Sequence, residues 1–447
     1  MRILLIQPCD ASYKYRGYFS RPITYAPITL PILAALVPKD LDAEITICDE
    51  GVQPANYSLD SWDVVGISGV TSSITRGFEL ADRFRERGTH VVMGGAFTSL
   101  NPDLSAEHAD TVVAGYAERV FPEILRTLAN GGRPEKIYIE KAPRFLSAPP
   151  ARRDLIPWGR YIPVATVQAS RGCSHTCHYC SVPRQSSGSP CFRPVDEVID
   201  EVRGLRSKRV LFFDPNISLE KEYSSELFEK LIPLNRKWAA AATVDFPFDR
   251  ELFDLAVRSG LMGLLIGFES MDQVNMNSCG KPFNEVSRYK ESVKLCHDRH
   301  VGVLGTFIVG FDGDTPRVFD DLAEFVDEIE IDIPRFAVLT PFPGTPLFNR
   351  LKHEGRILTE NWQVYDSIRV VFTPDGMSVS DLQRGILKVW QNTFKSSRIL
   401  KRALRAKWMP MTNLGANLIF MGYAKTLPAL VNRPDTPVYS RSVLDIS

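Results

Sequence analysis

The pattern of apolar and polar positions divides the chain into three parts. Up to residue 130, short β-rich apolar runs alternate with amphipathic stretches of helical period. Runs that are apolar on both faces are typical of parallel strands covered by helices, so we expect a doubly wound, Rossmann-like α/β domain over 1–130. The expected strands are Ile3–Gln7, Ala43–Cys48, Val64–Ser68, His90–Met93 and Thr111–Ala114, and the expected helices are Ile28–Val37, Ile74–Arg87 and Glu118–Ala129.

A segment rich in Gly, Pro and Arg follows, and we interpret 131–163 as a linker. The alternation then resumes as six strand–helix units, which predict a partial, TIM-like (β/α)6 barrel over 164–345. The last part, 346–447, loses this alternation and predicts a helical C-terminal extension. The barrel strands are expected at 165–170, 209–213, 238–243, 262–268, 302–309 and 333–339, and the helices at Val195–Ser207, Leu219–Leu231, Arg250–Ser259, Asn284–His300 and Pro316–Ile329.

Small residues mark the carboxyl ends of the strands in the first domain. Ligands of doubly wound sheets bind at this edge, and glycine lets the backbone approach a large flat ligand closely. An equally simple interpretation is that these glycines only form tight strand-to-helix turns. The candidate ligand-binding residues are Gly66, Ser68, Gly94, Gly95 and Gly115.

Composition narrows the class of protein. Lys plus Arg and Asp plus Glu are both 53 in 447 residues, so no overall field favours nucleic acid as a partner. The apolar run at the start of the chain is too short for a signal peptide and resembles a buried strand. We therefore expect a cytoplasmic protein, in which the eight cysteines favour metal binding over disulfides.

Three of those cysteines lie on one loop after the first barrel strand, with the spacing C-x3-C-x2-C: Cys173, Cys177 and Cys180. Three thiolates from a single turn suit a metal or an iron–sulfur cluster, and they are one ligand short of a closed structural site. The alternative is a zinc site completed by His175, His178 or Cys191, although zinc sites more often use paired C-x2-C elements.

This loop, with Tyr179 just before its last cysteine, resembles that of the radical S-adenosylmethionine (SAM) superfamily. The resemblance implies a [4Fe-4S] cluster on Cys173, Cys177 and Cys180, with SAM on the open iron. It further implies that Tyr179, Asp214 at the end of the second strand and Glu269 at the end of the fourth contact SAM. Later segments, Gly310 to Asp314 and Pro341 to Pro346, fit the same family.

The first domain resembles the cobalamin-binding domain of class B radical SAM enzymes. The Asp-x-His-x-x-Gly signature of other cobalamin proteins is absent, since neither His90 nor His108 matches it, and Glu118 follows Gly115-Tyr116-Ala117 where the family often has Gly-Glu-x-Glu. The resemblance implies a cobalamin-dependent methyltransferase acting on an unactivated carbon of a natural product or lipid. In that family a deoxyadenosyl radical removes a substrate hydrogen and methylcobalamin delivers the methyl group.

Two other functions stay open. One is a cobalamin-binding radical SAM enzyme that rearranges or cyclises its substrate, and the other is an iron–sulfur protein that senses redox state or SAM. The enzyme interpretation implies a small-molecule or lipid substrate and an external electron donor of the flavodoxin or ferredoxin kind. No catalytic acid or base is indicated by the sequence.

The C-terminal part contains a basic stretch around Arg398 to Lys407, followed by an uncharged run from Trp408 to Ala424. Such a pair could lie on an anionic membrane as a peripheral contact. The alternative is a terminal helix that packs on the barrel and exposes a basic face.

Overall fold

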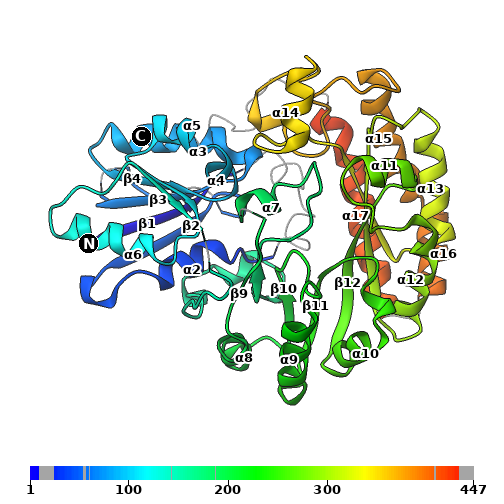
Figure 1. The fold of residues 1–447 in the computed structure, drawn as a ribbon, viewed down its shortest axis with the longest axis horizontal. Coiled ribbons are helices and arrows are strands. Elements are labelled where there is room, and N and C mark those ends of the chain that lie inside the picture. The colour runs from blue at the N-terminus through cyan, green and yellow to red at the C-terminus, as the bar shows by residue number, and fades with distance from the viewer. Residues whose placement is uncertain are drawn as a thin grey trace.

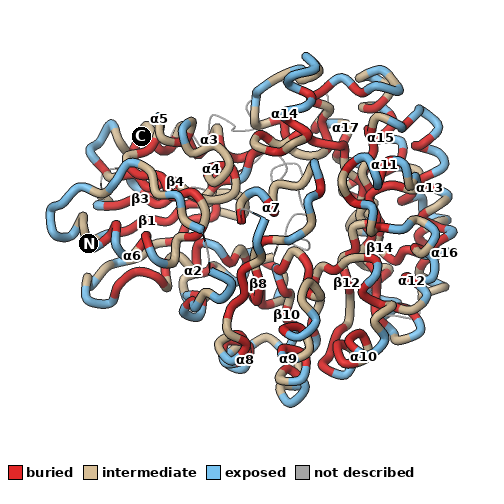
Figure 2. The backbone as a smooth tube through the Cα atoms, viewed as in Figure 1, coloured by how far each residue is buried: buried red, intermediate tan, exposed pale blue. Residues whose placement is uncertain are grey.

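The protein contains two six-stranded parallel sheets, which lie side by side (Figure 1). The computed structural model describes residues 1–9, 25–53, 57–59, 61–141, 143–186, 188–406 and 409–431. In both sheets the strands are largely buried, with exposed residues concentrated on the surrounding helices and loops (Figure 2). The mixed α/β class expected from the sequence is therefore confirmed.

The first sheet has the strand order β2-β1-β3-β4-β5-β6, and every neighbouring pair is parallel. The order reverses direction between β1 and β3, which is where doubly wound sheets bind ligands. The strands are β1 (Arg2–Gln7), β2 (Glu44–Asp49), β3 (Val64–Ser68), β4 (His90–Gly94), β5 (Thr111–Gly115) and β6 (Ile137–Glu140), and the helices are α2 (Thr29–Ala35), α3 (Ile74–Arg85), α4 (Ala96–Leu100), α5 (Pro102–His108) and α6 (Val120–Ala129).

Successive strand residues bury opposite faces of this sheet. Leu4 and Ile6 of β1 belong to the core that contains α3, whereas Ile3 and Leu5 belong to the core formed with α2 and α6. This alternation follows from the two-residue period of a strand and explains why each strand is a continuous apolar run.

The second sheet forms an open, barrel-like arc in the order β14-β13-β12-β11-β10-β7, with helices packed outside it. All its pairs are parallel. The strands are β7 (Ala165–Val167), β10 (Arg209–Phe212), β11 (Lys237–Ala242), β12 (Leu261–Glu269), β13 (Gly302–Val309) and β14 (Ile333–Val338), and the helices are α8 (Val195–Gly204), α9 (Lys221–Leu231), α10 (Arg250–Arg258), α11 (Gln273–Ser278), α12 (Tyr289–His297) and α13 (Val318–Glu328).

The structure contains elements that were not expected from the sequence, among them the short helices α4, α5 and α11. The segment expected as a linker contributes β6, which pairs with β5 at the sheet edge, where Ile139 is 69% exposed. The first barrel strand was expected over 165–170 but ends at Val167. Its last residues instead form β8 (Ser170–Arg171), which pairs antiparallel with β9 (Cys191–Phe192), and α7 (Val182–Gln185) lies between them.

The C-terminal extension is helical, with α14 (Pro346–His353), α15 (Val379–Thr393), α16 (Ser396–Arg405) and α17 (Pro410–Val431). By length and composition, α17 is the one helix in the described ranges that is apolar enough to cross a membrane, and 28% of its most apolar stretch is buried. Its Asn413 and Asn417 donate to the side chain and the carbonyl of Asp332, at 3.0 and 2.9 Å, so one face of α17 is fixed to the barrel.

Candidate active site

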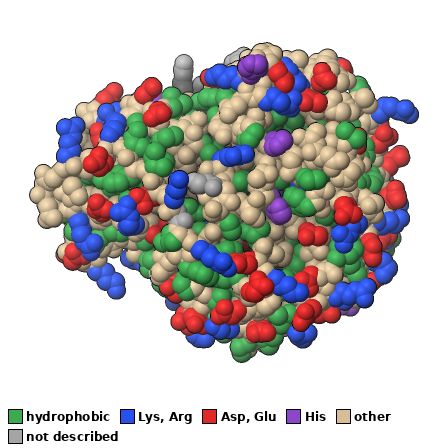
Figure 3. All heavy atoms as spheres, in the orientation of Figure 1, with side chains coloured by type: hydrophobic (Ala, Val, Ile, Leu, Met, Phe, Trp, Pro, Cys, Tyr) green, Lys and Arg blue, Asp and Glu red, His purple; other side chains and the backbone are tan. Residues whose placement is uncertain are grey.

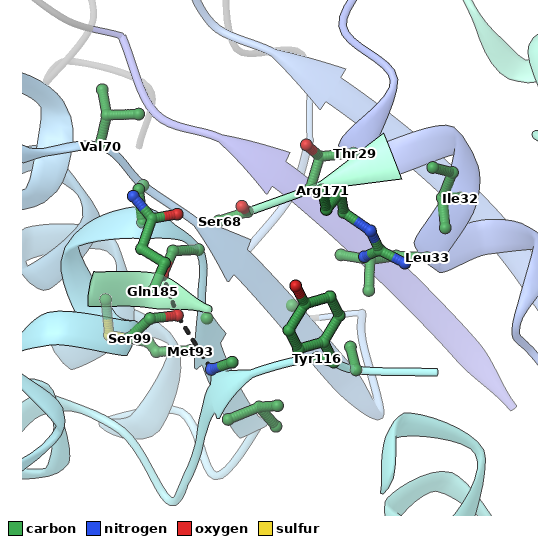
Figure 4. Close-up of a pocket in the computed structure, with 18 of the residues that line it drawn as sticks. Thr29, Ile32, Leu33, Ser68, Val70, Met93, Ser99, Tyr116, Arg171 and Gln185 are labelled. Carbon is green, nitrogen blue, oxygen red and sulfur yellow. Dashed lines mark hydrogen bonds between the residues drawn. The ribbon is translucent and has the colours of Figure 1, made fainter. Parts of the chain in front are cut away.

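A cavity of about 510 Å³ lies between the carboxyl ends of the two sheets. All five small residues predicted from the sequence line it: Gly66, Ser68, Gly94, Gly95 and Gly115. The second sheet contributes Gln168 and Phe213, which follow its strands β7 and β10. Arg171 and Gln185 line the cavity from the segment that contains the cysteines (Figure 4). Sequence reasoning placed the strand-end residues correctly at one edge, but it did not foresee that the barrel would form the opposite wall.

Two of the glycines are required by the backbone itself. Gly95 and Gly115 have φ of +96° and +99°, and a Cβ on Gly115 would lie 2.0 Å from the carbonyl oxygen of Glu140. The amide of Gly115 donates to Ser99 Oγ at 3.0 Å, which fixes the end of β5 (Figure 4). Tight turns thus account for these two positions, and at both of them the cavity wall carries no side chain.

Arg171 connects the cavity to the cysteine loop. Its guanidinium is ion-paired with Glu118 of the first domain and lies 4.8 Å from the ring centroid of Tyr116. In the described part of the chain, the second carboxylate oxygen of Glu118 is buried without a hydrogen-bond partner. A buried acceptor of this kind on a cavity wall suits a ligand that carries amide N–H donors.

The three predicted cysteines lie together between β8 and α7. Cys177 is buried, and Cys173 and Cys180 are half-buried. The amide of Cys180 donates to the carbonyl of Cys177 at 3.2 Å, which closes the turn. Burial, with smaller contributions from the neighbouring Cys177 and Cys173, raises the pKa of Cys180 to about 12. None of the eight cysteines forms a disulfide.

The thiols suit a cluster better than a single ion. Among the residues that the structure describes, no three His, Cys, Asp or Glu side chains could hold one metal ion. Thiolates of an iron–sulfur cluster bind separate irons and so do not converge on one point. In the same described ranges, none of His175, His178 and Cys191 completes such a group with the cysteines, and His175 stacks on Phe283 with ring centroids 3.9 Å apart.

Asp214 positions the start of the cysteine loop. Its Oδ1 accepts from the amide of Ala169 at 3.0 Å, and its Oδ2 accepts from the amide and the hydroxyl of Ser170, the latter at 2.6 Å. Burial raises the pKa of Asp214 to about 6. Both oxygens are therefore engaged by the residues just before the loop, whereas its neighbours Phe213 and Pro215 line the cavity.

Glu269 ends β12 in a left-handed conformation, with φ of +65°, and is ion-paired with Lys281 at 2.8 Å. Lys281 also donates to the carbonyl of Gly267 at 2.8 Å, and both side chains of the pair are nearly buried. The segment just before Lys281 packs on the cysteine loop, because the amide of His178 donates to the carbonyl of Cys279 at 2.8 Å. Burial raises the pKa of Tyr179, whose ring contacts Phe311 edge-on at 6.3 Å.

Sequence reasoning missed Arg171, Glu118 and Lys281 as site residues. Glu118 was seen only as part of a departure from the family pattern. The position of Arg171 next to the cysteines was a usable signal, whereas a lone lysine in a loop gave none.

Comparison with known proteins identifies related sequences and folds. Residues 167–326 match the radical SAM superfamily, and residues 345–416 match a domain of unknown function (DUF4070). The chain is 29% identical to bacteriochlorophyllide d C-12(1)-methyltransferase of Chlorobaculum tepidum over 84% of each chain. It is 26% identical to the C-8(2)-methyltransferase of the same organism, over 84% of this chain and 87% of that protein.

The fold also resembles a solved structure. The radical SAM methyltransferase TsrM of Kitasatospora setae, solved with cobalamin and a [4Fe-4S] cluster bound, superposes with a TM-score of 0.71. The match covers 95% of this chain and 99% of that one at 15% identity, so it shows a shared fold.

Proposed function

We propose that this chain, whose residues 167–326 match the radical SAM superfamily, is a cobalamin-dependent methyltransferase that acts on an unactivated carbon of a natural product or lipid. One observation carries this proposal. A cavity at the edge of the first sheet, with several glycines in its wall, adjoins a three-cysteine loop on the barrel, and Arg171, just before that loop, lines the cavity. A site for a large cofactor thus lies next to a site for a cluster.

The cysteine loop would hold the cluster. Cys173, Cys177 and Cys180 are its three protein ligands in this proposal, which leaves one iron for SAM. When bound, the cluster supplies the electron that cleaves SAM into methionine and a 5′-deoxyadenosyl radical. Glu269, held by Lys281, and Tyr179 would contact SAM, since a carboxylate accepts from an ammonium or from ribose hydroxyls. Asp214 would act on the loop and not on SAM.

The cavity would hold cobalamin. Gly66, Ser68, Gly94, Gly95 and Gly115 would form its wall, and the free oxygen of Glu118 would accept from a corrin amide. When bound, cobalamin supplies a carrier for a methyl group taken from SAM. In this proposal the first domain extends to β6, the barrel follows to about residue 345, and the remaining helices form the extension.

A second cavity of about 320 Å³ adjoins the first, because Val70 and Ala96 line both. Ser181, directly after the cysteine loop, lines it together with Phe342 and Tyr365. Its one carboxylate, Asp366, is ion-paired with Arg369 at 3.0 Å. A wall of aromatic, aliphatic and hydroxyl side chains favours an uncharged, largely apolar acceptor. We place the substrate here, in a cytoplasmic enzyme that takes electrons from a flavodoxin- or ferredoxin-like donor.

The proposal can be tested without knowing the acceptor. The anaerobically reconstituted protein is mixed with SAM, reductant and cob(I)alamin, and S-adenosylhomocysteine and deoxyadenosine are quantified. The proposal predicts both products, with deoxyadenosine lost in Cys177→Ala. Deoxyadenosine without S-adenosylhomocysteine would instead support a rearrangement or cyclisation, and the absence of both products would refute the enzymatic function.

A further inference from the structure

The C-terminal helices form a local region of one charge sign. Residues 382–434 contain no Asp or Glu, although acidic and basic residues balance at 53 each over the whole chain. On the face drawn in Figure 3, acidic and basic side chains are interspersed. The basic residues in 382–434 are Arg384, Lys388, Lys395, Arg398, Lys401, Arg402, Arg405, Lys407, Lys425 and Arg433.

Some of these basic side chains form ion pairs within the protein, and others are exposed to solvent. Arg398 and Arg402 bind Asp327 at 2.6 and 3.1 Å, which anchors α16 on the barrel. Lys395, Lys401 and Lys425 are exposed and form no ion pair with any residue that the structure describes. Positive charge is therefore available at the surface of α16 and α17.

Large apolar side chains are exposed between these lysines. Leu404 and Met411 are both 80% exposed, at the end of α16 and the start of α17. Leu400 lies one turn before Leu404, and Leu418 lies two turns after Met411, so each helix exposes an apolar stripe.

The opposite face of this helix pair is fixed to the barrel. Arg402 donates to Asn417 at 3.0 Å, and Asn417 donates to the carbonyl of Asp332. A helix held in this way presents its outer face without leaving the protein. A basic, apolar outer face of this kind suits the boundary between headgroups and acyl chains of an anionic lipid surface.

We propose that α16 and α17 dock this chain on a bilayer that contains anionic lipids. Leu400, Leu404, Met411 and Leu418 enter the headgroup boundary, and Lys395, Lys401 and Lys425 contact the lipid phosphates. The helices lie in the plane of the surface, with Asn413 and Asn417 still bound to the barrel. This docking does not depend on the cluster or on cobalamin.

Co-sedimentation of the full chain with vesicles tests the proposal. Vesicles of phosphatidylcholine mixed with phosphatidylglycerol should bind the protein, whereas vesicles of phosphatidylcholine alone should bind it much more weakly. The double variant Leu404→Gln/Met411→Gln should lower the partition coefficient on anionic vesicles by about tenfold, because two apolar side chains no longer enter the boundary. Lys401→Gln should weaken the binding and its dependence on salt.

Matched variants control for nonspecific effects. Val274→Gln and Lys39→Gln change an exposed apolar and an exposed basic residue elsewhere, and both should bind as the wild type does. Thermal unfolding of each variant checks that it is folded. The proposal is overturned if neither vesicle binds the wild type or if the double variant binds as tightly. It is also overturned if light scattering shows that this face joins two copies of the chain and the double variant separates them.

Discussion

At the scale of single residues, Asp214 holds the two residues that lead toward the cysteine loop. Its two carboxylate oxygens accept hydrogen bonds from the amides of Ala169 and Ser170 and from the hydroxyl of Ser170. Ser170 lies three residues before Cys173. An asparagine at this position would have to point its NH₂ group at one of the two backbone amides. A backbone N–H group cannot turn to become an acceptor, so the two donors would face each other. Asp314 offers a comparison, because it accepts from two backbone amides through one oxygen and from the side chain of Asn275 through the other.

Asp214→Asn should therefore lower the free energy of unfolding by about 1–3 kcal/mol, the cost of a buried unsatisfied group, and should lower the iron content after reconstitution. Asp314→Asn should cost less, because the amide of Asn275 can flip to accept from the new N–H donors. Denaturant unfolding and iron analysis of both variants provide the check. Equal stability and equal iron content in the two variants would contradict a positioning role for Asp214.

The buried pair of Lys281 and Glu269 gives a second prediction. Lys281→Met should cost about 3–5 kcal/mol, because it leaves a nearly buried carboxylate without its partner. Adding Glu269→Gln should recover much of that loss. The exposed pair of Lys290 and Glu328 is the control, and Lys290→Met there should change stability by less than about 1 kcal/mol. A double-mutant cycle with no coupling between 269 and 281 would be incompatible with the pair seen in the structure.

At the scale of elements, β6 closes the edge of the first sheet through Gly115. Gly115→Ala adds a Cβ that would lie 2.0 Å from the carbonyl oxygen of Glu140 and keeps φ at +99°, so β6 must move. Gly131→Ala is the matched control, because its φ is +71° but no atom lies within 4 Å of the added Cβ. In this control, the strained backbone alone should lower the free energy of unfolding by about 1–2 kcal/mol. Gly115→Ala should lower the free energy of unfolding by clearly more, as measured by denaturant unfolding. An equal decrease in the two variants would contradict the close packing of β6 on Gly115.

The same elements show what the sequence could predict. The strand over Val64–Ser68 and the one over 302–309 have the predicted bounds, because apolar residues buried on both faces leave a clear pattern. β6 was missed, since an edge strand of four residues with one exposed isoleucine resembles a loop. The spacing of the cysteines predicted their loop. The pairing of Glu269 with Lys281 could not be predicted, because it depends on how the chain returns after β12.

At the scale of the whole molecule, the two sheets meet at their carboxyl edges, and the ion pair of Arg171 with Glu118 connects the two domains there. Arg171 directly precedes the cysteine loop and Glu118 belongs to the first domain, so the cavity adjoins the loop. No local sequence pattern contains this information, because the contact depends on how the two domains face each other. Because the cavity lies next to the cysteine loop, it favours a second cofactor beside the cluster.

Cofactor content after anaerobic reconstitution with iron, sulfide and hydroxocobalamin tests this two-cofactor site most directly. The account predicts about four irons and one cobalamin per wild-type chain, and about no iron but still one cobalamin in Cys177→Ala. Glu118→Ala should retain the iron and bind cobalamin more weakly. A wild-type chain that keeps its iron but releases all cobalamin on gel filtration would contradict the account.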